Sequence, residues 1–271
     1  MANMQAVGAY AEANCQSLKS EMQANLHELF QPRIIACVTG AYPGGRSHAL
    51  DLPTARDIIL ITRSSGCVVH VTTCLSEFPE ACVPLEGFFD IYGSSLVPLL
   101  NTSRACRASQ AVAMIEFGLQ FLSGNKLFSR TPLIKLEILD SALMPVPAEI
   151  LECLKSLPDA VRLRTLPFLP PIPAVIQDSI ELGCPAIRLA AGQIGTKSGI
   201  LDQNKLKAAV EAAYGTPVVF EGGLDSAYDI MKAAELGATA VLVNSAFALA
   251  KDPREKAKEL RKAADQAWTT I

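Results

Sequence analysis

The stretch Leu133-Ile134-Lys135-Leu136-Glu137-Ile138 has the length and apolar composition of a strand buried in a parallel sheet, yet it contains two charged residues. Because side chains alternate across a strand, we expect Lys135 and Glu137 on one face and the apolar side chains on the other. Two ionisable groups on a buried face are costly unless they pair or take part in chemistry. A desolvated lysine loses basicity, and a neutral amine can attack a carbonyl to form a Schiff base. Lys135 is therefore a candidate catalytic residue; the alternative is a strand-end lysine whose amine reaches solvent.

The length and composition of the chain favour one large domain. The chain has 271 residues, 50% of them hydrophobic, close to the roughly 250 residues of an eight-stranded α/β barrel. A net charge of −3 without a basic run gives no electrostatic footprint for nucleic acid or an anionic membrane. No apolar segment reaches the roughly 18–20 residues of a membrane span, and the polar first thirty residues do not have the pattern of a secretory signal. We therefore expect a cytoplasmic protein.

The cysteines and histidines predict neither a disulfide framework nor a metal site. The three histidines and eight cysteines are scattered, without CxxC pairs or zinc-ligand spacing. Cys37 and Cys184 lie in or beside apolar runs, which indicates buried thiols in a reducing compartment. Three others, near expected strand ends, are candidates for a reactive thiol: Cys67, Cys74 and Cys106.

Apolar strand patterns alternate with helical patterns along the chain. We expect strands at residues 33–39, 68–73, 97–101, 133–138, 162–166, 186–190, 217–221 and 240–244. We expect helices at residues 109–123, 147–157, 173–182, 201–213 and 226–236, with Gly237 as the C-terminal glycine of the last and Asp252-Pro253 opening a final helix. Eight β-then-α units predict a (β/α)8 TIM barrel over residues 30–271, preceded by a helical extension over residues 1–29. The alternative is a doubly wound open sheet, but no GxGxxG follows an early strand.

In such a barrel the functional site lies at the C-terminal ends of the strands. Glycine-rich turns follow the sixth strand (Gly192 to Gly199) and the seventh (Gly222-Gly223), and the eighth ends in Asn244-Ser245. Glycines let backbone N–H groups approach a phosphate, and a short helix behind the eighth strand adds its dipole. This pattern favours a phosphate site over ordinary strand-to-helix turns.

The same segments resemble the thiazole synthase family, whose members build the thiazole phosphate ring of thiamin. Residues 134–138 resemble the Schiff-base strand of that family. Residues 225–253, with Glu235-Leu236-Gly237-Ala238 and Val243-Asn244-Ser245-Ala246, resemble its last two units. Residues 33–43, notably Thr39-Gly40-Ala41-Tyr42-Pro43, resemble its first strand and loop, and Leu100-Asn101-Thr102 its third strand. The resemblance covers residues 30–265.

The resemblance implies a reaction. In this family the lysine condenses with the ketone of 1-deoxy-D-xylulose 5-phosphate, and sulfur arrives as the C-terminal thiocarboxylate of a small carrier protein. Lys135 would then form the imine, with Glu137 and Glu221 as proton-transfer groups. The resemblance, together with these turns, assigns phosphate binding to Gly195, Thr196, Gly222, Gly223, Asn244 and Ser245, mainly through the backbone N–H groups of Gly222, Gly223 and Ser245. It implies no metal and no redox cofactor.

The sequence departs from the family pattern at three places, and two of them are loops on the side away from the phosphate. The seventh strand of the family ends in aspartate followed by Ala-Gly-Ile-Gly, whereas here Glu221 precedes Gly-Gly-Leu-Asp. A polar turn after the fifth strand is replaced by Phe168-Leu169-Pro170-Pro171-Ile172, and the turn after the fourth becomes Leu143-Met144-Pro145-Val146-Pro147. These changes indicate altered chemistry on the non-phosphate half of the site.

We therefore expect a divergent member of this family that forms a lysine imine with a ketose or aldose phosphate and takes sulfur from a carrier protein. The product is the thiamin thiazole or another sulfur compound. The alternatives are a Schiff-base aldolase or isomerase without sulfur transfer, and a non-catalytic barrel that binds a phosphosugar. The hydrophobic loop 168–172 and Leu143-Met144-Pro145 are candidates for a carrier-docking surface or for an interface in a homo-oligomer.

Overall fold

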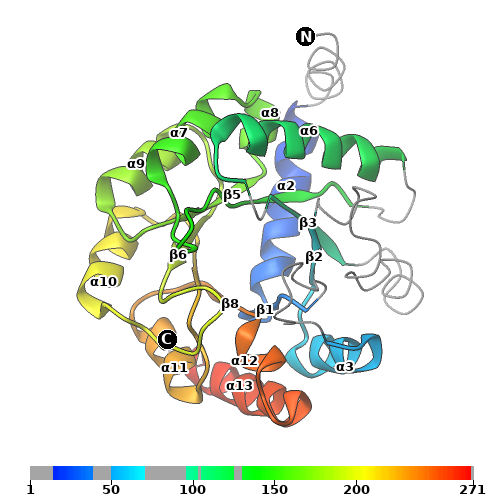
Figure 1. Ribbon diagram of the computed structural model, residues 1–271, viewed down its shortest axis with the longest axis vertical. Helices are drawn as coiled ribbons and strands as arrows, with labels where there is room; N and C mark the ends of the chain where they lie inside the picture. Colours follow the sequence, from blue (N-terminus) through cyan, green and yellow to red (C-terminus); the bar gives the residue numbers. More distant parts are fainter. Residues whose placement is uncertain (1–14, 39–49, 71–95, 103–104, 125–129, 270–271) are drawn as a thin grey trace.

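Eight parallel strands form the centre of the molecule, and helices surround them (Figure 1). The computed structural model describes residues 15–38, 50–70, 96–102, 105–124 and 130–269. The strands are β1 (Ile34–Ala36), β2 (Gly66–His70), β3 (Val97–Asn101), β4 (Leu133–Leu136), β5 (Thr165–Leu169), β6 (Ile187–Ala190), β7 (Val218–Glu221) and β8 (Ala240–Val243). The described helices are α2 (Cys15–Phe30), α3 (Leu52–Thr62), α6 (Ala108–Gly124), α7 (Pro147–Ser156), α8 (Asp159–Arg162), α9 (Pro173–Glu181), α10 (Gln203–Ala212), α11 (Ala227–Glu235), α12 (Ser245–Ala248) and α13 (Pro253–Ala267).

The strand order closes the sheet into the predicted barrel. Hydrogen-bonded neighbours follow the order β1-β8-β7-β6-β5-β4-β3-β2, so β1 and β2 are the two ends of the sheet. At this seam the backbone N–H of Ala36 donates to Ser64 Oγ over 3.0 Å. A Cβ at Gly66 would lie 3.2 Å from Ile35 Cγ2 and 2.6 Å from Leu29 Cδ1, so glycine permits the close approach. The predicted (β/α)8 fold is confirmed.

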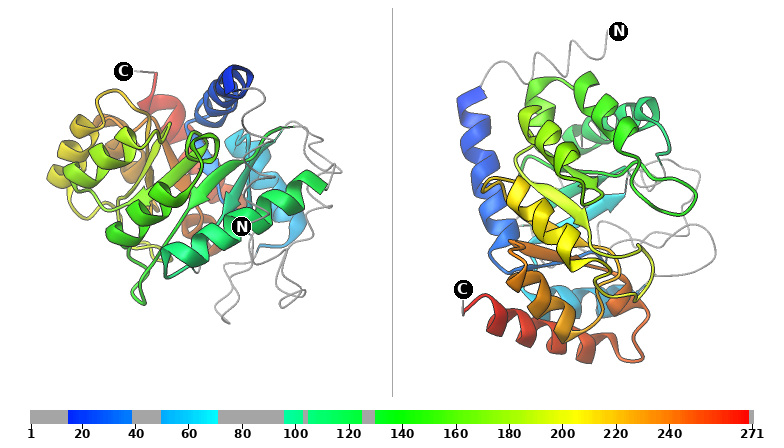
Figure 2. Two further views of the ribbon diagram at one scale, coloured as in Figure 1. Left: turned by 90° about the horizontal axis from the view of Figure 1, so that it is seen from above. Right: turned by 90° about the vertical axis from the view of Figure 1, so that its left-hand side faces the viewer.

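The α2 helix covers the N-terminal end of the barrel. Its buried Met22, Leu26, Leu29 and Phe30 pack with the inward-facing apolar side chains near the starts of the strands. Figure 1 looks along the barrel and shows α2 crossing behind the strands, and the right-hand view of Figure 2 shows the helix along one side of the molecule. The helix therefore completes the core inside the barrel. The predicted division of the chain into an extension and a barrel between residues 29 and 30 stays a prediction.

Leu29→Ala is expected to destabilise the fold by about 2–5 kcal/mol, because it opens a cavity in this core. Leu29 is fully buried. Leu60→Ala on α3 is the matched control, since the Leu60 side chain is 61% exposed; it should change stability by less than about 0.5 kcal/mol. Urea denaturation followed by far-UV circular dichroism measures both. Equal effects of the two substitutions would show that α2 is not part of the cooperative unit.

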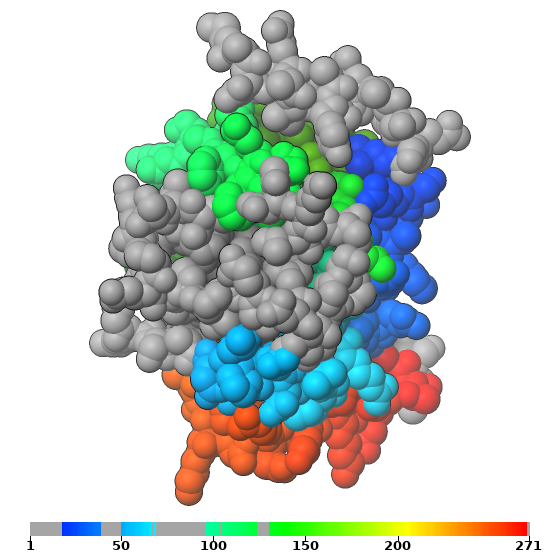
Figure 3. Space-filling view, turned by 90° about the vertical axis from the view of Figure 1, so that its right-hand side faces the viewer, coloured from blue at the N-terminus to red at the C-terminus, as the bar shows by residue number. Residues whose placement is uncertain are grey.

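Helix α3, which follows the first strand, and helix α13, which follows the last, pack together on the outside of the barrel. Figure 3 shows α3 against the orange and red C-terminal residues, and α3 packs on α13. Two exposed ion pairs join the helices, Arg254 with Asp57 at 2.6 Å and Arg63 with Asp265 at 3.3 Å. The Asp252 side chain accepts from the N–H groups of Arg254 and Glu255, as predicted for the start of this helix.

The fifth strand begins later than predicted. We expected a strand at residues 162–166, but residues 159–162 form α8 and β5 runs from Thr165 to Leu169. Pro167 lies within β5, and the ladder with β6 begins one residue later at Phe168↔Arg188. Proline has no N–H to donate and therefore often marks the end of a strand, but β5 continues through Pro167. The stretch 168–172 is thus a loop only after Leu169.

The first predicted strand, residues 33–39, is shorter in the structure, because β1 ends at Ala36. The other predicted boundaries that fall in the described residues agree with the structure to within about two residues, and Gly237 follows α11 with a φ of 91° as predicted. The predicted loop 39–43, residues 71–73 of the second predicted strand, Cys74 and Cys82 lie outside the described residues. Within the described ranges, no helix combines the length and apolar character required to cross a membrane.

Candidate active site

Four charged side chains point into the barrel from three strands. Lys135 lies in β4, Glu137 directly after it, Arg188 in β6, and Glu221 at the end of β7. In each strand the flanking residues are apolar and belong to the core between strands and helices, so alternation directs the charged residues inward. Their exposed fractions are 2%, 4%, 1% and 6%, respectively. We call these four residues the charged quartet.

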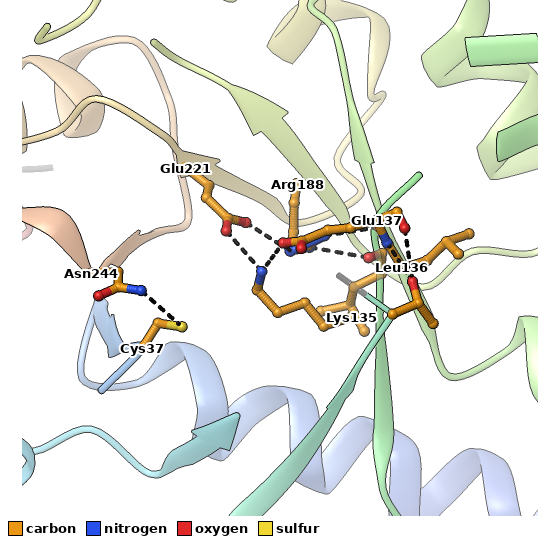
Figure 4. A network of polar contacts seen from close by, with 9 residues as sticks. Cys37, Lys135, Leu136, Glu137, Arg188, Glu221 and Asn244 are labelled. Atoms are coloured by element: carbon orange, nitrogen blue, oxygen red, sulfur yellow. Dashed lines mark hydrogen bonds and ion pairs between the residues drawn. The ribbon is translucent and has the colours of Figure 1, made fainter. Parts of the chain in front are cut away.

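The quartet forms one continuous network, shown in Figure 4. Lys135 Nζ donates to Glu137 Oε1 and lies 2.9 Å from Glu221 Oε1. Arg188 Nη1 lies 2.7 Å from Glu221 Oε2 and 3.3 Å from Glu137 Oε1. Two cations and two carboxylates therefore balance one another inside the barrel, which offsets part of the cost of burying them. The structure brings together all three predicted catalytic residues.

Two residues of the third strand unit hold Glu137 in place. The backbone N–H of Glu137 donates to Thr102 Oγ1, and the Thr102 hydroxyl donates to the Glu137 carbonyl, both over 2.9 Å. Asn101 is paired with Lys135 in the sheet register, and its side chain hydrogen bonds to the Glu137 carboxylate. Asn101 and Thr102, at the end of β3, thus orient the Glu137 carboxylate that contacts Lys135.

The predicted loss of basicity at Lys135 is wrong for this resting structure. Burial and the Arg188 charge act to lower the pKa of Lys135, but the Glu137 and Glu221 carboxylates outweigh them, and the pKa is raised. Burial acts to raise the pKa of Glu137, but the charges of Lys135 and Arg188 outweigh it, and the pKa is lowered. Lys135 therefore rests as an ammonium ion and must pass on a proton before it can attack a carbonyl.

Cys37 follows β1 and also faces the barrel interior. Its side chain is buried, and the Asn244 amide donates to the Cys37 sulfur over 3.8 Å. Burial, the largest influence, raises the pKa of the Cys37 thiol to about 12. The group is therefore a neutral thiol at physiological pH and a poor nucleophile.

Alkylation by iodoacetamide at pH 8 is expected to modify Cys106 and to leave Cys37 unmodified in the folded protein. Cys106 is exposed, whereas Cys37, Cys153 and Cys184 are buried, which confirms the predicted burial of Cys37 and Cys184. Peptide mass spectrometry measures the extent of labelling, and labelling in urea provides the control for both sites. Equal rates in the folded state would contradict the buried, protonated thiol.

The predicted phosphate-binding residues lie at the C-terminal ends of neighbouring strands, but they differ in whether their hydrogen-bonding groups already have a partner. Gly195 and Thr196 are in the turn after β6, Gly222 and Gly223 after β7, and Ser245 opens α12. Among the described residues, no backbone carbonyl accepts from the N–H of Gly223 or Ser245. By contrast, the Thr196 hydroxyl donates to Gln193 O over 2.7 Å within its own turn.

The glycines after β7 also have a purely structural role. A Cβ at Gly222 would lie 2.4 Å from Gly192 O, and one at Gly223 would lie 2.8 Å from Gly199 O. Both have positive φ, 87° and 74°. The two turns pack backbone against backbone, so glycine is required here whether or not an anion binds.

Sequence reasoning missed Arg188. The signal was present, because Ile187-Arg188-Leu189 places a charged residue in an apolar strand exactly as residues 134–136 do. It also missed that Phe168, read as part of a loop, is fully buried and lies under Arg188, with the guanidinium carbon 5.4 Å from the ring centroid. Within the described part of the chain, no group of three or more His, Cys, Asp or Glu residues is arranged to hold a metal ion.

Comparison with known proteins places this barrel in a family. The family model described as thiazole biosynthesis protein ThiG matches residues 72–269. A thiazole synthase from Chlorobaculum tepidum is 33% identical over 216 residues, covering 78% of this chain and 79% of the relative. The chain belongs to the thiazole synthase family.

Other members of the thiazole synthase family match a smaller part of the chain. The thiazole synthase of Shewanella sediminis is 35% identical over 176 residues, covering 64% of this chain and 63% of the relative. Among solved structures, the Amycolatopsis orientalis BexX/CysO complex contains a chain with a TM-score of 0.72 and 24% identity, covering 88% of this chain and 90% of that one. This structural likeness supports the barrel fold.

Proposed function

We propose that this protein is a thiazole-synthase-like enzyme in which Lys135 forms an imine with the carbonyl carbon of a phosphosugar and sulfur is then incorporated. The observation that carries the proposal is the position of the Lys135 amine between two carboxylates inside the barrel, 2.9 Å from Glu221 Oε1 and hydrogen-bonded to Glu137. An amine next to groups that exchange protons with it is suited to imine formation and to the later proton transfers. Membership of the thiazole synthase family supports the same chemistry.

The phosphosugar is a ketose or an aldose phosphate, with 1-deoxy-D-xylulose 5-phosphate as the first candidate. Its phosphate binds at the ends of β6, β7 and β8, mainly to backbone N–H groups of residues such as Gly223 and Ser245. Among the described residues, the N–H groups of Gly223 and Ser245 have no backbone acceptor, and α12 adds the partial positive charge of its first turn. Asn244 is the least suited of the predicted ligands, because its amide donates to Cys37.

Sulfur is supplied by a carrier protein that ends in a thiocarboxylate. The structural relative in a complex with CysO supports the idea that a barrel of this shape accepts a second protein. The carrier-docking surface predicted from the sequence loses Leu169, because this side chain is fully buried in β5. Met144 and Ile172, 40% and 45% exposed, remain available at the C-terminal rim of the barrel. We place the enzyme in the cytoplasm as a homo-oligomer; the buried free thiols suit a reducing compartment.

Trapping with borohydride tests the central step. The enzyme is incubated with ketose and aldose phosphates, reduced, and measured by intact-protein mass spectrometry. An adduct on the peptide that contains Lys135 identifies the sugar and supports imine chemistry. The adduct followed by product formation with a carrier thiocarboxylate supports sulfur incorporation, whereas sugar cleavage or isomerisation without sulfur supports an aldolase-type enzyme. Binding of a phosphosugar without an adduct would support the alternative of a non-catalytic barrel.

The phosphorylated sugar is expected to trap about 10² times more efficiently than the same sugar without its phosphate, because two or more charge-assisted hydrogen bonds are lost. Ser245→Ala should change this ratio by less than about threefold, since the backbone N–H remains. Initial trapping rates at low sugar concentration measure both, and inorganic phosphate should compete. Equal trapping of the two sugars would contradict the phosphate site. Gly223→Val is a poor test, because it also disrupts the packing of the two turns.

A further inference from the structure

Arg188 is almost wholly occupied by contacts within the protein. Its Nε donates to Leu166 O over 3.1 Å, and its Nη2 donates to Leu136 O over 2.9 Å. Its Nη1 donates to Glu221 Oε2 and Glu137 Oε1. A guanidinium has five N–H donors, and these bonds use four of them. One flat face of the guanidinium lies over the Phe168 ring, which further restricts its movement. Arg188 therefore has little capacity to bind a substrate directly.

The following inference rests on the proposed function. We propose that Arg188 is a positioning residue whose guanidinium holds Glu221 and Glu137 against the Lys135 amine, so that the amine passes its proton to a neighbouring carboxylate and not to solvent. The backbone carbonyls of β4 and β5 hold the guanidinium, and the guanidinium in turn holds two carboxylates that come from β7 and from the end of β4.

The charges of the quartet explain why the proton stays inside. An arginine remains protonated at any pH at which the enzyme works. With Lys135 as an ammonium and both glutamates ionised, the quartet is neutral. Transfer of the proton from Lys135 to a carboxylate preserves this balance, whereas its loss to solvent leaves an uncompensated negative charge in the barrel, which burial strongly disfavours.

Each step of the proposed sequence is balanced. The N–H bond at Lys135 Nζ breaks and an O–H bond forms at the carboxylate. The neutral amine adds to the carbonyl carbon; its nitrogen loses a proton as the carbonyl oxygen gains one, which gives a carbinolamine. The carboxylic acid then protonates the departing hydroxyl, water leaves, and a positively charged iminium replaces the ammonium. No electrons are exchanged, and the quartet is neutral again.

Glu221 is the better placed of the two proton acceptors. One of its oxygens faces Lys135 and the other faces Arg188, so the carboxylate bridges the two cations. Glu137 takes both cations on the same oxygen and also has the Asn101 hydrogen bond, and it is therefore the poorer acceptor.

The first measurement needs no substrate. The carboxyl carbons of the glutamates are labelled with 13C and titrated by NMR, with the Glu137 signal assigned from Glu137→Gln. In Arg188→Met, Glu137 is expected to titrate at higher pH than in the wild type, because one of its two neighbouring cations is lost. Arg107→Met is the matched control: Arg107 pairs with Glu149 at 2.9 Å on the surface, with its side chain 71% exposed. This control should leave the Glu137 titration unchanged.

The second measurement is the rate of imine trapping as a function of pH. Arg188→Met is expected to trap the sugar about 10² times more slowly, the size of loss expected when reacting groups shift by about 1 Å. Arg188→Lys keeps the charge but not the planar fork, so its rate should lie between those of the wild type and Arg188→Met. The pH profile of trapping should move in the same direction as the Glu137 titration, because Glu221 loses the same neighbouring cation in Arg188→Met. Arg107→Met should retain the wild-type rate and profile.

The outcomes separate this inference from the proposed function. A shifted titration with slower trapping supports it. A wild-type trapping rate and pH profile in Arg188→Met overturns it, with or without a shifted titration, as does slow trapping without a shift. If the methionine variant does not fold, a wild-type rate and profile in Arg188→Lys overturns it, and slower trapping with an altered profile supports it. If the wild-type enzyme traps no sugar, the proposed function fails, and the substrate-free titration alone decides whether Arg188 holds the carboxylates.

Discussion

Lys135→Arg is expected to abolish the sugar adduct completely while the protein stays folded. Arginine keeps the positive charge between Glu137 and Glu221, so the buried carboxylates remain compensated. Its guanidinium stays protonated and delocalised, however, and cannot condense with a carbonyl. Intact mass after borohydride reduction measures the adduct, and thermal unfolding checks the fold.

The control for this prediction is Lys207→Arg. Lys207 is an exposed residue of α10, and its substitution should leave the adduct yield unchanged. An adduct at wild-type yield in Lys135→Arg would mean that Lys135 is structural and that a different amine reacts. Peptide mapping of the adduct would then identify that amine.

Glu221→Gln is expected to reduce product formation by about 10²–10⁴, the usual contribution of a general acid or base. Glutamine still accepts a hydrogen bond from Lys135 but cannot take up its proton, and Lys135 retains Glu137 as a partner. Some trapped imine should therefore remain while the later proton transfers stall. Single-turnover assays that follow adduct and product in the same sample separate the two effects.

Two further variants define the role of this carboxylate. Glu221→Asp keeps the proton-transfer group but shortens its reach by one methylene, so its loss should be smaller than that of Glu221→Gln. Glu211→Gln, an exposed substitution on α10, should have no effect. Full product formation by Glu221→Gln would show that the carboxylate at the end of β7 has no part in proton transfer.

The barrel and the central lysine could be predicted because both are recorded in local patterns. Apolar runs alternate with amphipathic segments throughout the chain, and alternation within residues 133–138 places Lys135 and Glu137 on the inner face. Glu221 followed from its place at the end of the seventh strand. The same local logic, applied to residues 187–189, would have predicted Arg188.

What the sequence could not give are the consequences of bringing distant strands together. The direction of the Lys135 pKa shift depends on Glu221 and Arg188, which come from other strands, so burial alone predicted the wrong sign. The continuation of β5 past Pro167 depends on the pairing of Phe168 and Leu169 with β6, and this is a property of sheet register. The packing of Gly223 against Gly199 likewise exists only once two turns meet.

The α2 helix has a consequence for how the protein is made on the ribosome. The helix is synthesised early, but its apolar face packs with Val219, Ala240 and Leu242, which are among the last strand residues to be synthesised. Leu29 and Phe30 therefore stay partly uncovered until nearly the whole chain has emerged. Contacts this distant in sequence slow folding and expose the nascent chain to aggregation. Chaperone binding during translation is accordingly expected to begin at α2 and to end only after β8 is complete.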